Sequence, residues 1–250
     1  DPDHPVYREQ DAAFAGVIPE KYEELDRIVG LTLDRMGDDT LLVVMSDHGF
    51  ASWRRAMNLN SWLHQEGYLA LKNPGVRDDP GFFLNVDWTR TKVYGLGLNG
   101  LSVNLRGRAR WGTVNESEVD ALLAEVGEKL LATVDPVTNE RAVTKVYRCR
   151  DTFRHEEYLD VGPDLIVGYA EGMRVSDESA LGTVPLEVFS DNDGEWSGDH
   201  CMDHETVPGV LLTSRPLKRP APALENLAAA VLAEFGISGS EGNTDNQTIV

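Results

Sequence analysis

The stretch "LLVVMSDHGF", Leu41–Phe50, starts as an apolar run and ends in a carboxylate, an imidazole and a glycine. The run does not alternate with polar residues, which is typical of a strand covered on both faces in a parallel sheet. Successive side chains of a strand point to opposite faces, so Asp47 and His48 can converge only where the strand ends and the chain turns at Gly49. Ligands of open α/β sheets bind outside the carboxyl ends of strands, and Asp and His are common metal ligands. The stretch predicts a buried strand ending in a metal-ligand pair, or an Asp that caps the next helix beside a surface His.

The segments around this strand predict an α/β layer fold. "IPEKYEELDRIVGLTLDRM" precedes the strand and has the apolar period of a helix, with Pro19 in its first turn. "NESEVDALLAEVGEKLLATV" predicts a second helix, in which Ser117 and Asp120 form a capping pair and one face is lined by Val119, Leu122, Leu123, Val126 and Leu130. Further strands are predicted in "TKVYGLGLNGLSVNL", "PDLIVGYA" and "VLLTS", and a closing helix in "PALENLAAAVLAEFG". We therefore expect a mostly parallel sheet flanked by helices.

A second group of chemically active residues lies in a long polar loop before the last predicted strand. The segment "WSGDHCMDH" contains Asp199, His200, Asp203 and His204. His200 stands between Asp199 and Cys201 and could be a metal ligand, although the spacing matches no standard zinc signature. The alternative is a solvated acidic loop without a metal.

Composition excludes several classes of partner. The formal net charge is −19, and such a surface repels nucleic acid and anionic lipid. An anionic substrate would need a local positive group, either a metal or a few arginines. The two cysteines, Cys149 and Cys201, form no CxxC motif and predict free thiols. No apolar run reaches the roughly 18 residues of a membrane span.

Taken together, many segments in order resemble the alkaline phosphatase superfamily, in its type I phosphodiesterase/nucleotide pyrophosphatase branch. The resemblance extends over nearly the whole chain. It is carried by "DPDHP", "LLVVMSDHGF", "LNSWLHQEGYLAL", "VDWTRTKVYGLG", "NLRGR", "PDLIVGY", "DNDGEWSGDHCMD" and "VPGVLLTSRPL". It implies an alkaline-phosphatase-like fold and a metal-dependent hydrolase of phosphodiester or nucleotide pyrophosphate bonds.

The resemblance also implies a site with two divalent metal ions, usually zinc, with manganese as an alternative. Asp47 and His48 match the ligands of one ion, and His200 matches a ligand of the other. Asp199 and His204 are candidates for residues that support these ligands. The family's Thr or Ser nucleophile and three further ligands are expected upstream of Asp1, so no catalytic residue is assigned within this chain.

The same comparison sets the expected domain organisation. Residues 1–237 are expected to be the C-terminal part of one alkaline-phosphatase-like catalytic domain, and residues 238–250 a loose tail. Such a piece by itself should bind metal weakly and should not catalyse hydrolysis. Family members commonly continue "NLRGR" with Glu-Pro, whereas this chain reads "ARWG" after it, which puts substrate contacts there in doubt. The sequence leaves the oligomeric state open and favours the cytoplasm over secretion.

Two alternatives to the diesterase remain open. A relative within the superfamily could cleave phosphomonoesters, sulfates or phosphonates, or move a phosphoryl group, because these enzymes share the metal cage. A binding module could keep the fold without catalysis. The partner expected in the leading hypothesis is a small phosphate ester or nucleotide. The motif "GLGLNG" is not a dinucleotide-binding loop, because a predicted strand and not a helix follows it.

Overall fold

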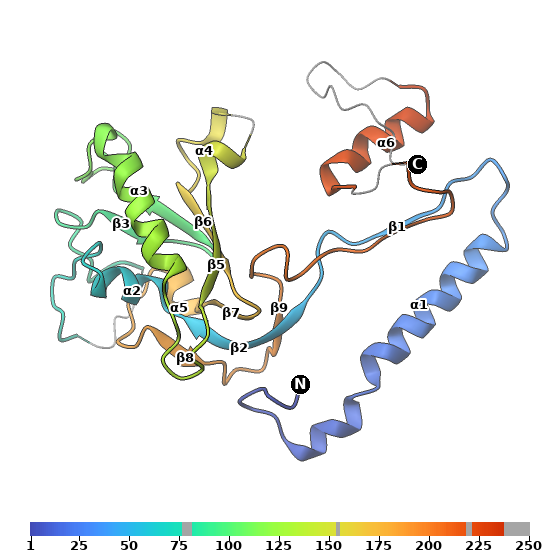
Figure 1. The fold of residues 1–250 in the computed structure, drawn as a ribbon, viewed down its shortest axis with the longest axis horizontal. Coiled ribbons are helices and arrows are strands. Elements are labelled where there is room, and N and C mark those ends of the chain that lie inside the picture. Colours follow the sequence, from blue (N-terminus) through green and yellow to red (C-terminus); the bar gives the residue numbers. More distant parts are fainter. Residues whose placement is uncertain (77–81, 154–155, 219–221, 238–250) are drawn as a thin grey trace. The chain divides into compact units, whose positions relative to one another are not determined.

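The computed structural model describes residues 1–76, 82–153, 156–218 and 222–237 (Figure 1). The chain divides into two compact units. The first unit contains Asp1–Tyr7 and Phe50–Val207, and the second contains Arg8–Gly49 and Pro208–Val250. The predicted tail at 238–250 lies outside the described residues, and the assignment of 1–237 to one catalytic domain stays a prediction.

Strand β2 (Ala51–Met57) organises one sheet of the first unit. It pairs in parallel with β7 (Gly172–Val175) and antiparallel with both β8 (Phe189–Asp191) and β9 (Gly198–Asp199). The pairing with β9 sets Ala51 opposite Asp199. This register places Gly198 and Asp199, the first residues of the "GDHCMDH" segment, beside β2. Strand β2 is itself hydrogen-bonded to several neighbouring strands.

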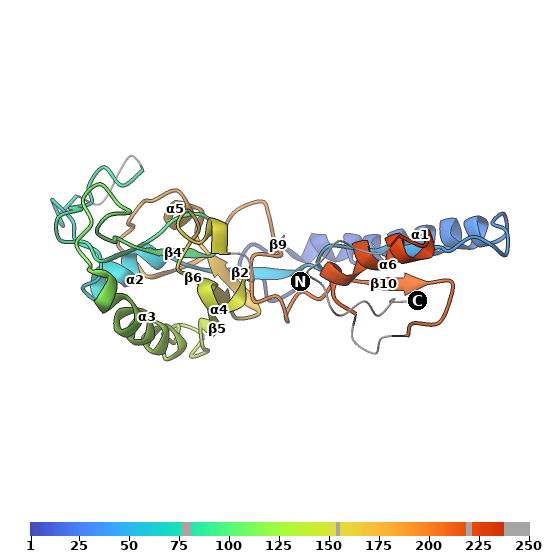
Figure 2. The ribbon, with the colours of Figure 1, turned by 90° about the horizontal axis from the view of Figure 1, so that it is seen from above.

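The second sheet of this unit is antiparallel throughout. Its strand order is β3 (Val93–Gly95), β4 (Gly100–Val103), β6 (Leu165–Tyr169) and β5 (Val143–Arg148). Helix α3 (Glu116–Leu131) packs against β5, and Figure 2 shows the helix along this sheet. The short connection between β3 and β4 is the "GLGLNG" motif, and β4 follows it as predicted.

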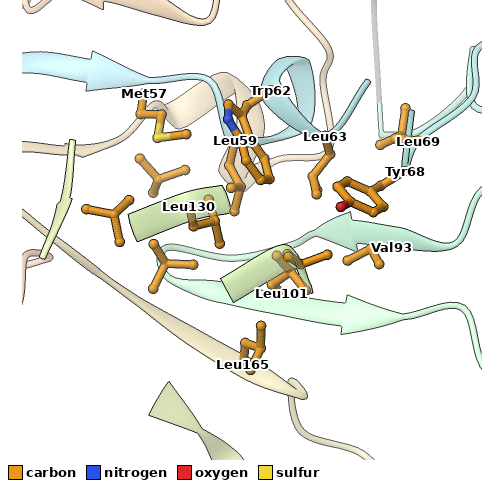
Figure 3. Packing of buried hydrophobic residues seen from close by; sticks show 14 of the residues in the cluster. Met57, Leu59, Trp62, Leu63, Tyr68, Leu69, Val93, Leu101, Leu130 and Leu165 are labelled. Carbon is orange, nitrogen blue, oxygen red and sulfur yellow. The ribbon is translucent and has the colours of Figure 1, made fainter. Parts of the chain in front are cut away.

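The core of the first unit lies between α3, the short helix α2 (Leu59–Gln65) and the antiparallel sheet (Figure 3). The apolar face predicted for α3 is the one that the structure buries. Complete burial of one leucine or valine side chain contributes about 1.5–3 kcal/mol to folding. The fully buried side chains include Leu63 and Leu69 near α2, Val93 and Leu101 from β3 and β4, Leu130 from α3, and Leu165 from β6.

Helix α3 begins two residues earlier than the predicted capping pair requires. The N-cap residue is Asn115, and the Glu118 carboxylate accepts hydrogen bonds from the Asn115 backbone N–H at 2.9 Å and from its side-chain amide at 2.6 Å. The predicted pair of Ser117 and Asp120 is therefore wrong. "NESE" and "SEVD" both fit the capping pattern, and the helix takes the earlier one, in which Glu118 satisfies the cap and lies in the first turn.

The α/β class and the mixture of sheets and helices are confirmed, but the described strand pairs differ from the expected mostly parallel sheet. Among them only β2 and β7 run in parallel. An apolar run indicates that other residues cover the strand, but it does not show whether the neighbouring strands run parallel or antiparallel to it. Short connections such as the one between β3 and β4 allow antiparallel pairing, whereas parallel neighbours need a long crossover.

In the second unit, β1 (Val43–Met45) pairs antiparallel with β10 (Leu211–Thr213). Val43 and Val44 are half-buried and Met45 is exposed, so β1 forms as predicted but is not covered on both faces. Helix α1 (Val17–Leu33) also forms as predicted, yet none of its residues is buried. The remaining elements of this unit are the 3-10 helices η1 (Glu9–Phe14) and η3 (Leu224–Asn226) and helix α6 (Leu227–Glu234).

Short helical turns complete the first unit. They are α4 (Cys149–Thr152), η2 (Glu156–Tyr158) and α5 (Asp177–Ala180). Among the described helices, none combines the length and the apolar character needed to cross a bilayer.

Candidate metal centre

Asp47 and His48 directly follow β1 in the second unit. Ser46 follows Met45, the last residue of β1, and its N–H donates to the Val210 carbonyl at 3.0 Å, while its hydroxyl oxygen accepts from the Val210 N–H at 2.8 Å. Both contacts fix the backbone immediately before the predicted ligand pair. The Asp47 side chain is 74 % exposed and that of His48 is 31 % exposed. The pair therefore follows a strand, as the sequence predicts, and its carboxylate is accessible to solvent.

The orientation of His48 suits metal binding. Its Nδ1 lies 2.9 Å from the Gly49 carbonyl oxygen, which can only accept, so Nδ1 is the donor of this contact and, in the neutral ring, Nε2 carries the lone pair. Nε2 lies 3.4 Å from Oδ2 of Asp47. Metal-binding histidines commonly donate their other ring nitrogen to a carbonyl or carboxylate in this way. The donor set of one carboxylate and one neutral imidazole fits zinc or manganese.

Asp199, His200 and Cys201 form a second donor group, in the first unit. One potential ligand atom from each residue lies within 4.8 Å of the other two, and this is the one such group of three among the residues that the structure describes. The His200 side chain is 42 % exposed, and its ring meets the Phe50 ring at an edge with centroids 5.4 Å apart. His200, the predicted ligand, is therefore the accessible member of this group.

The Asp199 side chain accepts hydrogen bonds from the backbone of this segment. Its Oδ1 accepts the N–H groups of His200 at 2.6 Å and Cys201 at 2.9 Å, and its Oδ2 lies 3.1 Å from Nε of Arg174. Burial alone would raise the pKa of Asp199, but the hydrogen bonds from Cys201 and His200 and the charge of Arg174 outweigh it and lower the pKa. The carboxylate is ionised and already engaged on both oxygens.

Cys201 is a buried, protonated thiol in this arrangement. Burial raises the pKa of its thiol to about 12, and the neighbouring Asp199 carboxylate acts in the same direction. A metal binds the thiolate and not the thiol. Cys149 is also buried, and both cysteines are free thiols, as predicted.

His204 lies outside the group that contains His200. Its Nδ1 is 3.1 Å from the Tyr147 hydroxyl, which donates to Oδ2 of the buried Asp203 at 2.7 Å. The His204 side chain is 72 % exposed. Burial and the Asp203 carboxylate raise the pKa of Tyr147, so its hydroxyl keeps its proton and remains a donor. His204 thus contacts Tyr147, whose hydrogen bond to Asp203 holds this loop. The role of His204 as a support for the ligands stays a prediction.

The N-terminal motif "DPDHP" is structural within the first unit. His4 is buried and its Nε2 lies 2.8 Å from the Trp53 carbonyl oxygen. Asp1 pairs with Arg54. Asp1 and His4 thus both contact β2, through Arg54 and Trp53.

Sequence reasoning missed Arg174, Trp53 and Tyr147, which hold the His200 segment. One signal was available for Arg174, because it interrupts the buried strand "GMRV" and a buried charge needs a paired partner. No local pattern could name that partner, since Asp199 is 25 positions away in the printed sequence. Tyr147 lies on β5 and gives no signal of its own.

A comparison with protein-family models finds a match that covers most of the chain. The family model described as type I phosphodiesterase / nucleotide pyrophosphatase matches residues 2–200. The match includes Asp47, His48 and His200. No curated protein matches the chain significantly. The chain belongs to the type I phosphodiesterase / nucleotide pyrophosphatase family.

Proposed function

We propose that this protein is a metal-dependent hydrolase of phosphodiester or nucleotide pyrophosphate bonds, and that Asp47, His48 and His200 are metal ligands in it. The family match supports a hydrolase of this general type. The observation that carries the metal role is the placement of His48, whose Nδ1 faces the Gly49 carbonyl and whose Nε2 lies 3.4 Å from Asp47. This arrangement presents an imidazole lone pair beside a carboxylate at a strand end.

The proposed roles of these residues follow from their chemistry. Asp47 and His48 would hold one divalent ion and His200 would help to hold a second, with zinc favoured by the nitrogen and oxygen donors. Bound ions of this kind lower the pKa of a hydroxyl nucleophile and neutralise charge on the non-bridging phosphate oxygens. Asp47 brings negative charge that balances an ion, and the Gly49 carbonyl keeps His48 in the tautomer that can bind it. In keeping with the family resemblance, the nucleophile is proposed to be a Thr or Ser outside this set.

The substrate is proposed to be a small phosphate ester or nucleotide. A net charge of −19 disfavours approach of a polyanion, so a small anion drawn by a local positive site fits better than a nucleic acid strand. Two metal ions would supply that positive charge. The same residues are compatible with phosphomonoesterase, sulfatase, phosphonate hydrolase or phosphomutase chemistry, which is distinguished by the substrate assayed.

Hydrolysis of bis-p-nitrophenyl phosphate by the complete protein, with its nucleophile, tests this proposal. Treatment with a chelator should abolish the release of p-nitrophenol, and added Zn²⁺ or Mn²⁺ should restore it. Asp47→Ala and His48→Ala should lose activity while the thermal unfolding transition is retained. Asp38→Ala is the matched control, because this exposed acid lies in the same unit and outside the ligand motif. Full activity in the His48 variant would refute the assignment.

A further inference from the structure

Arg174 is a buried cation next to the predicted ligand His200. It lies on β7, is 5 % exposed, and its guanidinium carbon sits 3.6 Å from the centroid of the Trp53 ring. One NH group donates to Asp177 at 2.7 Å, and Nε lies 3.1 Å from Asp199. A buried charge is costly unless it is paired, so this contact network holds the guanidinium in one place.

The strand pairing explains how Arg174 reaches Asp199. Strands β7 and β9 both pair with β2, and Trp53 of β2 lies opposite Gly172 of β7. The Arg174 side chain covers the Trp53 ring and meets Asp199 of β9. A planar guanidinium can stack on an aromatic ring while its N–H groups pair with carboxylates, a geometry that the compact ammonium of lysine does not offer.

Asp199 connects the Arg174 guanidinium to the backbone of His200. Its Oδ1 accepts the His200 and Cys201 N–H groups, and its Oδ2 faces Arg174. We propose that Arg174 and Asp199 are positioning residues that fix the His200 backbone for metal binding, and that Asp199 is not itself a metal ligand. This inference rests on the proposed function, because it takes His200 as a ligand.

The far end of the same loop has a separate anchor and supplies a matched control. Asp203 is buried and accepts a hydrogen bond from the Tyr147 hydroxyl at 2.7 Å, and its own N–H donates to the Tyr169 carbonyl at 2.9 Å. Tyr147→Phe removes one anchor of the loop without touching Asp199. A general loosening of the loop would make this variant as harmful as a change at Arg174, whereas specific positioning of His200 would not.

Isothermal titration of the metal-free 250-residue chain with Zn²⁺ tests the inference, together with His200→Ala as the reference for a lost ligand. Arg174→Met should weaken Zn²⁺ binding by roughly 10- to 100-fold, the range for groups that support a metal ligand. Arg174→Lys should recover part of this loss because it keeps the charge. Asp199→Asn, which keeps an oxygen for the two N–H groups, should weaken binding less than His200→Ala. Tyr147→Phe should bind Zn²⁺ nearly as the unchanged chain does.

The double variant Arg174→Met with Asp199→Asn separates positioning from loss of folding. If the two residues act through one contact, the double variant should bind no more weakly than Arg174→Met alone, and its melting transition should remain cooperative. Zn²⁺ binding by Arg174→Met equal to that of the unchanged chain, with binding lost in His200→Ala, would overturn the inference alone. Asp199→Asn as harmful as His200→Ala would show that Asp199 is a ligand and also overturn it. Unchanged binding in His200→Ala would instead overturn the proposed role of His200.

Discussion

Arg55 and Asp135, 80 positions apart, form a buried ion pair in which Nε donates to Oδ2 at 2.7 Å and a second N–H donates to Oδ1 at 3.0 Å. The Asp135 side chain is fully buried. The guanidinium also pairs with Asp191 of β8. This bidentate contact ties the turn after α3 to β2, the strand that carries Trp53 and pairs with β9.

Replacement of Asp135 by alanine should strongly destabilise the first unit. The change leaves the Arg55 charge without its main buried partner, and breaking such a pair costs about 3–5 kcal/mol. The free energy of unfolding from urea denaturation measures this effect. Asp3→Ala is the control, because the Asp3 side chain is 77 % exposed and lies 3.5 Å from Arg54 in a surface pair. Equal stability of the two variants would contradict the structural role of the buried pair.

Two neighbouring leucines at the end of α3 should differ sharply in their contribution to stability. Leu130 is completely buried, whereas Leu131 is 36 % exposed. Leu130→Ala removes methyl groups from a packed core and should cost about 2–5 kcal/mol. Leu131→Ala should cost about 0.5 kcal/mol, as surface substitutions do. Chemical unfolding of both variants checks this, and a smaller effect at Leu130 would show that α3 presents another face to the sheet.

The helices were predictable from the sequence because their period is local. The face predicted for α3 contains Val119, Leu123 and Leu130, and all three are buried. The α1 pattern also formed a helix, but the same pattern could not reveal that its apolar side chains, such as Tyr22, are exposed. Periodicity shows which residues share a face and does not show what covers that face.

The direction of each strand and the residues that hold the candidate ligands in place depend on contacts between distant parts of the chain. A single sequence does not show these contacts. The run that contains Val43–Met45 has the composition of a covered parallel strand, yet it pairs antiparallel with β10. Asp47, His48 and His200 could be named from short motifs. Arg174 could not, because its role arises from the registers of β7 and β9 against β2.

The capping contact of α3 predicts a specific dependence of stability on pH. Backbone and side-chain hydrogen bonds from Asn115 lower the pKa of Glu118. A carboxylate whose pKa is lower in the folded state stabilises the protein above its unfolded pKa, and this contribution disappears as the pH falls through the folded pKa. Glu118→Gln should therefore reduce the melting temperature at pH 7 and have little effect near pH 3. The same reduction at both values would show that the charge is not involved.

Cys201 offers a test of which members of the second donor group bind metal. Its thiol pKa is raised to about 12, so the thiolate is scarce at neutral pH. Cys201→Ser should change the Zn²⁺ dissociation constant by less than roughly tenfold, the smallest loss expected for a supporting group. His200→Ala should have a larger effect. Loss of binding in the Cys201 variant would identify the thiolate as a ligand.

The central claim is that His48 binds a divalent metal ion through Nε2. Calorimetric titration of the metal-free chain with Zn²⁺ tests it most directly, with His64→Ala as the matched control. His64 also has its Nδ1 near a backbone carbonyl, that of Leu69 at 2.9 Å, but it lies in α2 and outside the ligand motif. The account predicts that His48→Ala binds fewer Zn²⁺ ions or binds them more weakly, while His64→Ala binds Zn²⁺ as the unchanged chain does. Identical titrations of the unchanged chain and His48→Ala would contradict it.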